Sequence, residues 1–177
     1  MYRDKSLLPK EGIRLAALGL LASEGPMGYT ALAQAVRQFT GTFWGPTLDV
    51  MSSSIELLRF EGLIDVGADT DRLVTITATG RAHLDELLEA SVRAPSSDFS
   101  KLVVALKLRY LHLLPEDEQA DQLAALAEAC ASERARLADL RAREGNGAPG
   151  FLAWLDHEIA RIDADIAFYT RPRAPRC

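Results

Sequence analysis

Residues 48–81 constrain the fold of this chain most strongly. Gly62 would end the first helix of this segment, because glycine adopts left-handed geometry at little steric cost. Two short β-rich runs, 63–66 and 73–76, flank a polar loop and indicate a hairpin. Thr77 is placed to cap the helix that follows. The order helix, hairpin, helix predicts the second half of a winged helix-turn-helix. The first helix carries an apolar stripe at helical spacing, formed by Leu48, Met51, Ile55 and Leu58.

Two helices are expected before this segment. Residues 12–23 are apolar around most of a helical circumference, so we expect that helix to be buried on more than one side. A second helix opens near Thr30, and a loop over residues 40–46 is predicted from its Gly and Pro residues. The loop would hold two adjacent aromatic side chains, Phe43 and Trp44, which either cover a core or line a ligand site.

The second half of the chain reads as helical throughout. A linker at 94–98 precedes it, and a long helix from Pro115 to about Glu144 is followed by a last helix. The last helix has the most regular seam in the chain, which favours dimerisation over packing within one chain. The predicted dimerisation residues are Leu152, Leu155, Ile159, Ile162, Ile166 and Tyr169.

These patterns predict a mainly α fold with two domains. Residues 1–93 would form a winged helix-turn-helix domain, and residues 98–170 an α-helical dimerisation domain. Residues 171–177 would form a disordered tail.

Composition limits the class of protein. Hydrophobic residues make up 48% of the chain and charged residues 25%, as in ordinary globular proteins, and no apolar run is long enough to span a membrane. Two distant cysteines, Cys130 and Cys177, indicate no disulfide framework, so we expect a reducing cytoplasm. The net charge is −5. Charge alone would therefore not indicate DNA binding, which depends largely on neutralising phosphates.

Chemistry-bearing residues form no catalytic pattern. The three histidines lie on separate predicted helices without metal-ligand spacing, and the glycines form no phosphate loop. Cys130 falls on an apolar seam and is interpreted as a small core residue. We therefore expect no enzyme activity, no metal and no cofactor.

The chain resembles the PadR-like transcriptional regulators along nearly its whole length. The matching residues are those at 17–21, at 25–29, at 61–64 and at 76–81, together with Ile55, Leu58 and Leu84. The resemblance implies a homodimer joined through C-terminal helices that binds operator DNA as a repressor. It also implies that a small aromatic or drug-like effector can release the DNA in some members.

The third helix would enter the major groove, where its N-terminal side chains meet base edges. Arg59 lies on its flank, and Asp49 could only accept hydrogen bonds from bases. The base-reading candidates are Thr47, Ser52, Ser53 and Glu56. The phosphate-positioning candidates are Tyr29, Thr30, Arg72 and the N-terminal arm.

Two further functions stay open. A winged-helix module for protein interaction, with weak or lost DNA binding, is favoured by the acidic wing and by Leu57 and Phe60 on the outer side of the third helix. A sensor for small molecules is compatible with DNA binding, and its pocket would be lined by Phe43, Trp44, Trp154 or Phe168.

Overall fold

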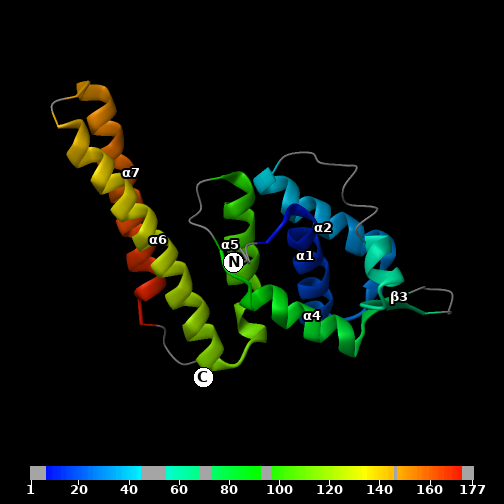
Figure 1. The fold of residues 1–177 in the computed structure, drawn as a ribbon. Helices are drawn as coiled ribbons and strands as arrows, with labels where there is room; N and C mark the ends of the chain where they lie inside the picture. The colour runs from blue at the N-terminus through cyan, green and yellow to red at the C-terminus, as the bar shows by residue number, and fades with distance from the viewer. Residues whose placement is uncertain (1–6, 45–54, 68–72, 93–96, 146, 173–177) are drawn as a thin grey trace. The chain divides into compact units, whose positions relative to one another are not determined.

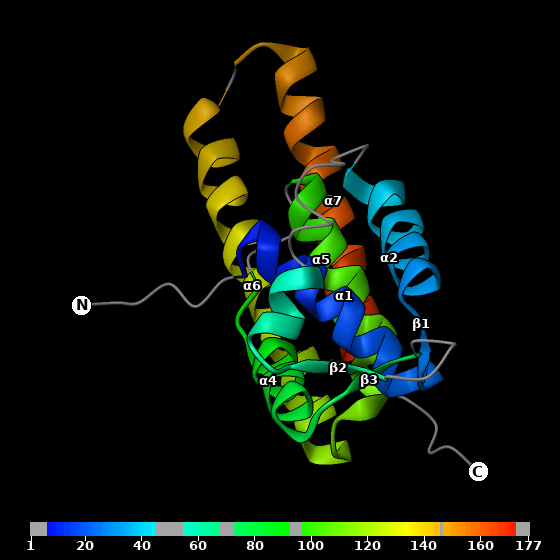
Figure 2. The ribbon, with the colours of Figure 1, turned by 90° about the vertical axis from the view of Figure 1, so that its right-hand side faces the viewer.

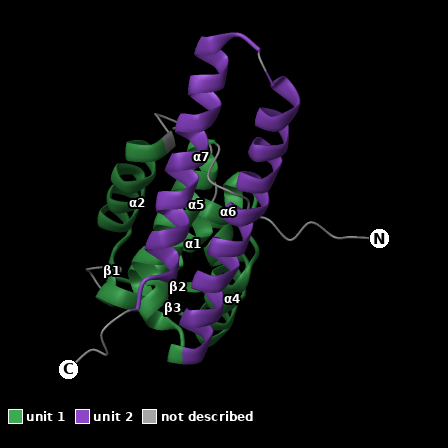
Figure 3. Cartoon of the chain, turned by 90° about the vertical axis from the view of Figure 1, so that its left-hand side faces the viewer, with its two compact units in different colours: residues 1–91, 95–116 green, residues 92–94, 117–177 purple. Residues whose placement is uncertain are grey.

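The computed structural model describes residues 7–44, 55–67, 73–92, 97–145 and 147–172 (Figure 1). The chain forms two compact units, which Figure 3 distinguishes by colour. Unit 1 comprises residues 1–91 and 95–116, and unit 2 comprises residues 92–94 and 117–177. The fold is mainly α, with one small sheet, as the sequence predicts.

Helix α1 (Pro9–Glu24) lies at the centre of unit 1. It packs against α2 (Tyr29–Trp44), α4 (Ala78–Glu89) and α5 (Asp98–Tyr110). Its residues 15–18 and 20–21 are all buried. These contacts confirm the prediction that the helix is covered on more than one side. The physical reason is that a helix that is apolar around its circumference must be buried on several sides.

A three-stranded antiparallel sheet lies beside the helices (Figure 2). Strand β3 (Leu73–Ile76) is central, with β2 (Ile64–Val66) on one side and β1 (Met27–Gly28) on the other. The β2–β3 pairing sets residue 64 opposite residue 76, so the predicted hairpin is confirmed. The sequence did not predict β1, which is too short to show an alternating pattern.

Helix α2 corrects one prediction. The expected loop at 40–46 is helical as far as Trp44, the last described residue before a gap. The Thr40 hydroxyl donates to the Val36 carbonyl oxygen at 2.8 Å, and the Thr42 hydroxyl donates to the Gln38 carbonyl oxygen at 2.9 Å. These bonds satisfy the two hydroxyl groups within the helix, so the threonines and the intervening glycine do not end it.

N-capping residues mark the starts of helices α4 (Ala78–Glu89) and α5 (Asp98–Tyr110). Thr77 caps α4, since its hydroxyl oxygen accepts from the Gly80 N–H at 3.0 Å, as predicted. Ser97 caps α5 in the same way, accepting from the Ser100 N–H at 3.1 Å.

Helix α5 and the 3-10 turn η1 (Leu111–Leu113) belong to unit 1, whereas the sequence pattern groups residues 98–113 with the C-terminal helices. The reason is contact with α1 and α2, which sequence periodicity does not reveal.

The described residues of unit 2 form two helices, α6 (Glu116–Glu144) from residue 117 onward and α7 (Pro149–Thr170). They run antiparallel and are linked by two ion pairs: Arg134 Nε to Asp163 Oδ1 at 2.5 Å, and Arg141 Nε to Asp156 Oδ1 at 2.9 Å. Cys130 is buried, which confirms its assignment as a core residue, and burial raises the pKa of its thiol.

Candidate nucleic-acid interface

The described end of the third helix spans residues 55–60. Ile55 and Leu58 are buried, which confirms this half of the predicted stripe; Leu48 and Met51 lie outside the described residues. The opposite side is exposed and carries Glu56, Leu57, Arg59 and Phe60. This exposed side is available to a partner molecule because the inner side is held in the core.

The helix end is tied closely to the hairpin. Gly62 has φ +72°, a left-handed conformation in which the chain reverses after the helix. The Leu63 N–H then donates to the Leu58 carbonyl at 2.9 Å, and the Thr77 hydroxyl donates to the Gly62 carbonyl at 2.7 Å. The Arg14 guanidinium from α1 pairs with the Glu61 carboxylate at 2.6 Å. The third helix, the hairpin and α4 therefore keep a defined mutual orientation.

Close packing at α4 reinforces this junction. A Cβ built at Gly80 would lie 2.0 Å from the Leu63 carbonyl oxygen. Only glycine lets the first turn of α4 approach the hairpin backbone this closely. The sequence singled out Gly80 as part of a family motif, and the structure supplies the steric reason for it.

Two of the predicted DNA-contacting residues come together. Tyr29, at the start of α2, lies near the carboxylate of Glu56 on the third helix. Partial burial raises the pKa of the Tyr29 hydroxyl, and the Glu56 carboxylate raises it further. Thr30 lies exposed beside it at the first turn of α2.

The remaining predicted DNA-contacting residues differ in whether they lie within the described part of the chain. Thr47, Asp49, Ser52, Ser53 and Arg72 lie outside the described residues. Among the described residues of the hairpin, Asp65 is exposed, and its carboxylate accepts the N–H of Val66 at 2.8 Å. No sequence pattern indicates the Arg14–Glu61 ion pair or the approach of Tyr29 to Glu56, because each joins residues that are far apart in the chain.

The predicted dimerisation seam is covered within the single chain. Leu155, Ile162 and Tyr169 are buried, and Leu152, Ile159 and Ile166 are half-buried. Burial raises the pKa of the Tyr169 hydroxyl to about 12, with Cys130 on α6 adding to the effect. The seam therefore packs toward α6, and its role in dimerisation stays a prediction.

The predicted effector-pocket residues do not form one group. Trp154 and Phe168 are both half exposed on α7, and their spacing along one helix separates them by about 21 Å. Trp154 stacks on Phe151 with ring centroids 5.9 Å apart, whereas Phe168 meets Tyr169 edge to face. Phe43 lies in unit 1 against Phe39, with centroids 5.5 Å apart, and the side chain of Trp44 is not among the described ones.

Among the described residues, no helix combines the length and apolar character needed to cross a membrane. The same residues contain no cluster of three or more His, Cys, Asp or Glu side chains suited to a metal ion.

Solved structures with a similar chain course are distant in sequence. Bacillus subtilis PadR is 17% identical, covering 94% of this chain and 99% of its own, with a TM-score of 0.42. Its complex with operator DNA is 18% identical, covering 89% and 94%, with a TM-score of 0.38. The protein smu.1604c from Streptococcus mutans UA159 is 17% identical, covering 92% and 96%, with a TM-score of 0.39. At these values the structural similarity carries no functional argument.

None of the curated proteins matches the chain. The family of the chain is shown by a family model instead. A family model described as AphA-like transcriptional regulator matches residues 2–171, which is nearly the whole chain. The resemblance to PadR-like regulators drawn from short motifs is thereby confirmed. The chain belongs to the AphA-like family of PadR-like transcriptional regulators.

Proposed function

We propose that this protein is a sequence-specific DNA-binding repressor that acts as a homodimer in the cytoplasm. The observation that carries the proposal is the exposed side of residues 55–60, held by a buried inner side and tied to the hairpin and α4. In a helix-turn-helix, this is the helix whose N-terminal residues read base edges in the major groove. No catalytic step is part of the proposal.

The proposed interface contains one set of residues that read bases and another set that position phosphates. Thr47, Ser52, Ser53 and Glu56 read bases, with Asp49 and Arg59 beside them. Tyr29, Thr30 and Arg72 position the phosphates. The Glu56 side chain is exposed, and because a carboxylate can only accept hydrogen bonds, it favours a cytosine amino group.

The homodimer is formed through the C-terminal helices. Leu155, Ile162 and Tyr169 of the seam are buried, so the second copy contacts the more exposed parts of α7, which are the half-buried Leu152, Ile159 and Ile166 and the exposed Phe151, Trp154 and Phe168. Two reading helices then face successive major grooves, roughly 34 Å apart. Light scattering at micromolar concentration should find a dimer, and the double substitution of Trp154 and Phe168 by serine should yield a helical monomer. A wild-type monomer would remove the two-headed geometry.

DNA binding is tested by fluorescence anisotropy with DNA from the protein's own upstream region and with random DNA of equal length. Over about 50–200 mM salt, binding to the specific DNA should weaken steeply as counterions return to the phosphates. Arg59→Gln should reduce the salt slope by about 1. Arg136→Gln on α6, where the arginine pairs with Glu133, is the matched control. Equal, weak affinity for both DNAs would reject the proposal.

Two exposed side chains favour a second candidate, a winged-helix module for protein interaction. Leu57 is 47% exposed and Phe60 is 89% exposed, one helical turn apart on the same side. Apolar side chains at this position contribute nothing to phosphate binding. This candidate is favoured if Leu57→Ser and Phe60→Ser leave DNA affinity unchanged and the wild type does not distinguish its own upstream DNA from random DNA.

Release of DNA by a small aromatic or drug-like effector is the remaining part of the proposal. The half-exposed aromatic side chains of Trp154 and Phe168 support this part of the proposal. Quenching of tryptophan fluorescence by phenolic compounds, together with loss of DNA anisotropy, would support an effector. Quenching without release would contradict that role.

A further inference from the structure

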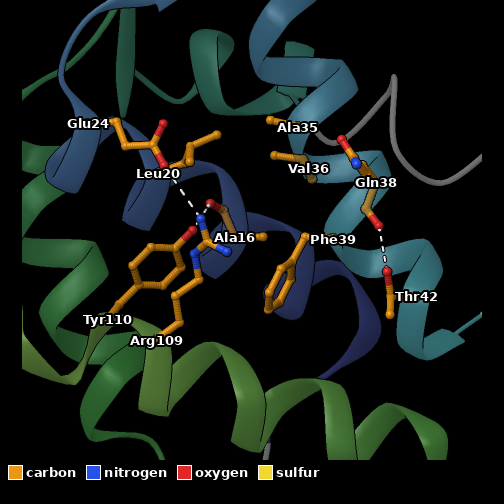
Figure 4. Close-up of a pocket in the computed structure, with 10 residues that line it drawn as sticks. All are labelled: Ala16, Leu20, Glu24, Ala35, Val36, Gln38, Phe39, Thr42, Arg109 and Tyr110. Atoms are coloured by element: carbon orange, nitrogen blue, oxygen red, sulfur yellow. Dashed lines mark hydrogen bonds and ion pairs between the residues drawn. The ribbon is translucent and has the colours of Figure 1, made fainter.

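A cavity of about 370 Å³ opens between α1, α2 and α5 within unit 1 (Figure 4). Its volume falls in the range of small-molecule sites. Ala16 and Leu20 line it from α1, and Ala35, Val36 and Phe39 line it from α2. Small side chains at Ala16 and Ala35 leave room for a flat ring between the two helices. None of these residues belongs to the predicted DNA interface or effector pocket.

The floor of the cavity is rigid because Tyr110 is locked in place. Its side chain is buried, and its hydroxyl donates to the Ala16 carbonyl oxygen at 3.4 Å. A Cβ built at Gly19 would lie 2.4 Å from the Tyr110 ring, so the ring rests directly on the α1 backbone. A preformed wall of this kind lowers the cost of binding, because little ordering is left to occur.

Arg109 provides a positioned donor at the edge of the cavity. Its guanidinium carbon lies 4.9 Å from the Phe39 ring centroid and 5.7 Å from that of Tyr110. Both distances are within the range of cation–π attraction, so the rings restrict the guanidinium. In Figure 4 it lies between the two rings and points toward Glu24.

The ion pair between Arg109 and Glu24 is long. The Nη2 atom of Arg109 lies 3.4 Å from Oε1 of Glu24, compared with about 2.7–2.9 Å in a well-formed charge-assisted bond. The edge therefore offers an N–H donor beside a carboxylate acceptor, with neither tightly engaged by the other. A second donor–acceptor pair can complete both bonds.

Charge restricts what this edge accepts. An anionic ligand would be attracted by Arg109 and repelled by Glu24, and a cationic ligand would meet the reverse. A neutral group with an N–H next to a carbonyl satisfies both residues without net charge. We propose that this cavity binds a neutral, flat, bicyclic heteroaromatic molecule whose N–H donates to Glu24 and whose adjacent carbonyl accepts from Arg109.

Isothermal titration calorimetry of the full-length protein without DNA tests the proposal, so the result is separate from that of the DNA-binding test. The probe is 2-quinolinone, which carries an N–H beside a carbonyl. Quinoline lacks this pair, and 2-naphthoate carries a negative charge. We expect saturable 1:1 binding of 2-quinolinone. Quinoline and 2-naphthoate should bind more weakly by roughly tenfold or more, because each would cover Arg109 and Glu24 and leave at least one of them without a partner. Equal or tighter binding of either comparison compound would overturn the proposal, as would absence of saturation at millimolar probe.

Variants assign the two polar partners. Arg109→Met should weaken 2-quinolinone roughly tenfold or more, because the carbonyl loses a charged donor. Glu24→Gln should weaken 2-quinolinone and strengthen 2-naphthoate, because the repelling charge is removed. Arg161→Met on α7, where the arginine pairs with Glu158, is the matched control and should change neither. Thermal unfolding of each variant checks the fold, and unchanged binding in folded Arg109→Met would overturn the proposal.

Discussion

Lys107 should make the stability of this protein rise with pH in the alkaline range. The side chain is 2% exposed on α5, and its ammonium donates to the Leu88 carbonyl oxygen near the end of α4. Burial lowers the pKa of Lys107 from 10.5 to about 8, and the nearby Glu89 carboxylate opposes this only in part. The hydrogen bond satisfies a terminal helix carbonyl, but the buried charge has a desolvation cost.

The sign follows from proton binding in the two states. Between pH 8 and 10.5 the unfolded chain holds the Lys107 proton and the folded chain has lost it, so the free energy of unfolding rises with pH. The two pKa values differ by about 2.5 pH units, which corresponds to about 3 kcal/mol. Burial raises the pKa of Tyr110 and Cys130, and these acids act in the opposite direction at high pH. The wild-type curve alone therefore does not isolate the lysine.

The Lys107→Met variant isolates the contribution of Lys107 to the pH dependence of stability. Methionine has a similar length and no charge. The free energy of unfolding of the variant, relative to that of wild type, should therefore be highest at pH 7, where Lys107 carries its buried charge in the wild type. Its relative stability should then fall by about 3 kcal/mol on going to pH 10.5. Urea unfolding followed by circular dichroism at half-unit pH steps measures the difference. A difference curve that stays flat from pH 7.5 to 10.5 would refute the assignment of a lowered pKa to Lys107.

Three substitutions probe the packing of unit 1, each measured by urea unfolding. Gly80→Ala should destabilise by about 1–3 kcal/mol or more, because its Cβ would meet the Leu63 carbonyl oxygen at 2.0 Å, and wild-type stability would contradict this contact. Gly19→Ala should cost about 1–3 kcal/mol, and less in a Tyr110→Ala background, where the clashing ring is absent; additive losses would argue against the clash. Thr77→Ala should cost about 1 kcal/mol through loss of the α4 cap, and an unchanged midpoint would rule out the cap as a stabilising contact.

Sequence reasoning succeeded where the relevant contact is local. Thr77 and its capped N–H are three residues apart, and Gly62 ends a helix through its own backbone conformation. The hairpin pairing is equally local, since only a short loop joins its strands. Each of these features depends on neighbours within one or two turns, and their residue types report them directly.

The candidate sites were harder to predict because they join distant parts of the chain. The glycine and proline residues at 41–46 predict a loop that includes Phe43 and Trp44, yet helix α2 continues as far as Trp44. Trp154 and Phe168 share an aromatic character but lie on one helix at opposite ends. The cavity edge pairs Glu24 with Arg109, which are 85 residues apart, and no periodicity connects them.

The sequence by itself determined the type and order of the elements, because apolar spacing, caps and glycine breaks act over one or two turns of chain. Its short motifs, such as the one at residues 76–81, also indicated the family. Only the tertiary structure decided which faces are used: α5 packs on α1 and α2, the seam of α7 is covered within one chain, and Arg109 reaches Glu24 across a cavity. These outcomes depend on contacts between residues far apart in the chain, where apolar burial is non-directional and many pairings satisfy the same pattern.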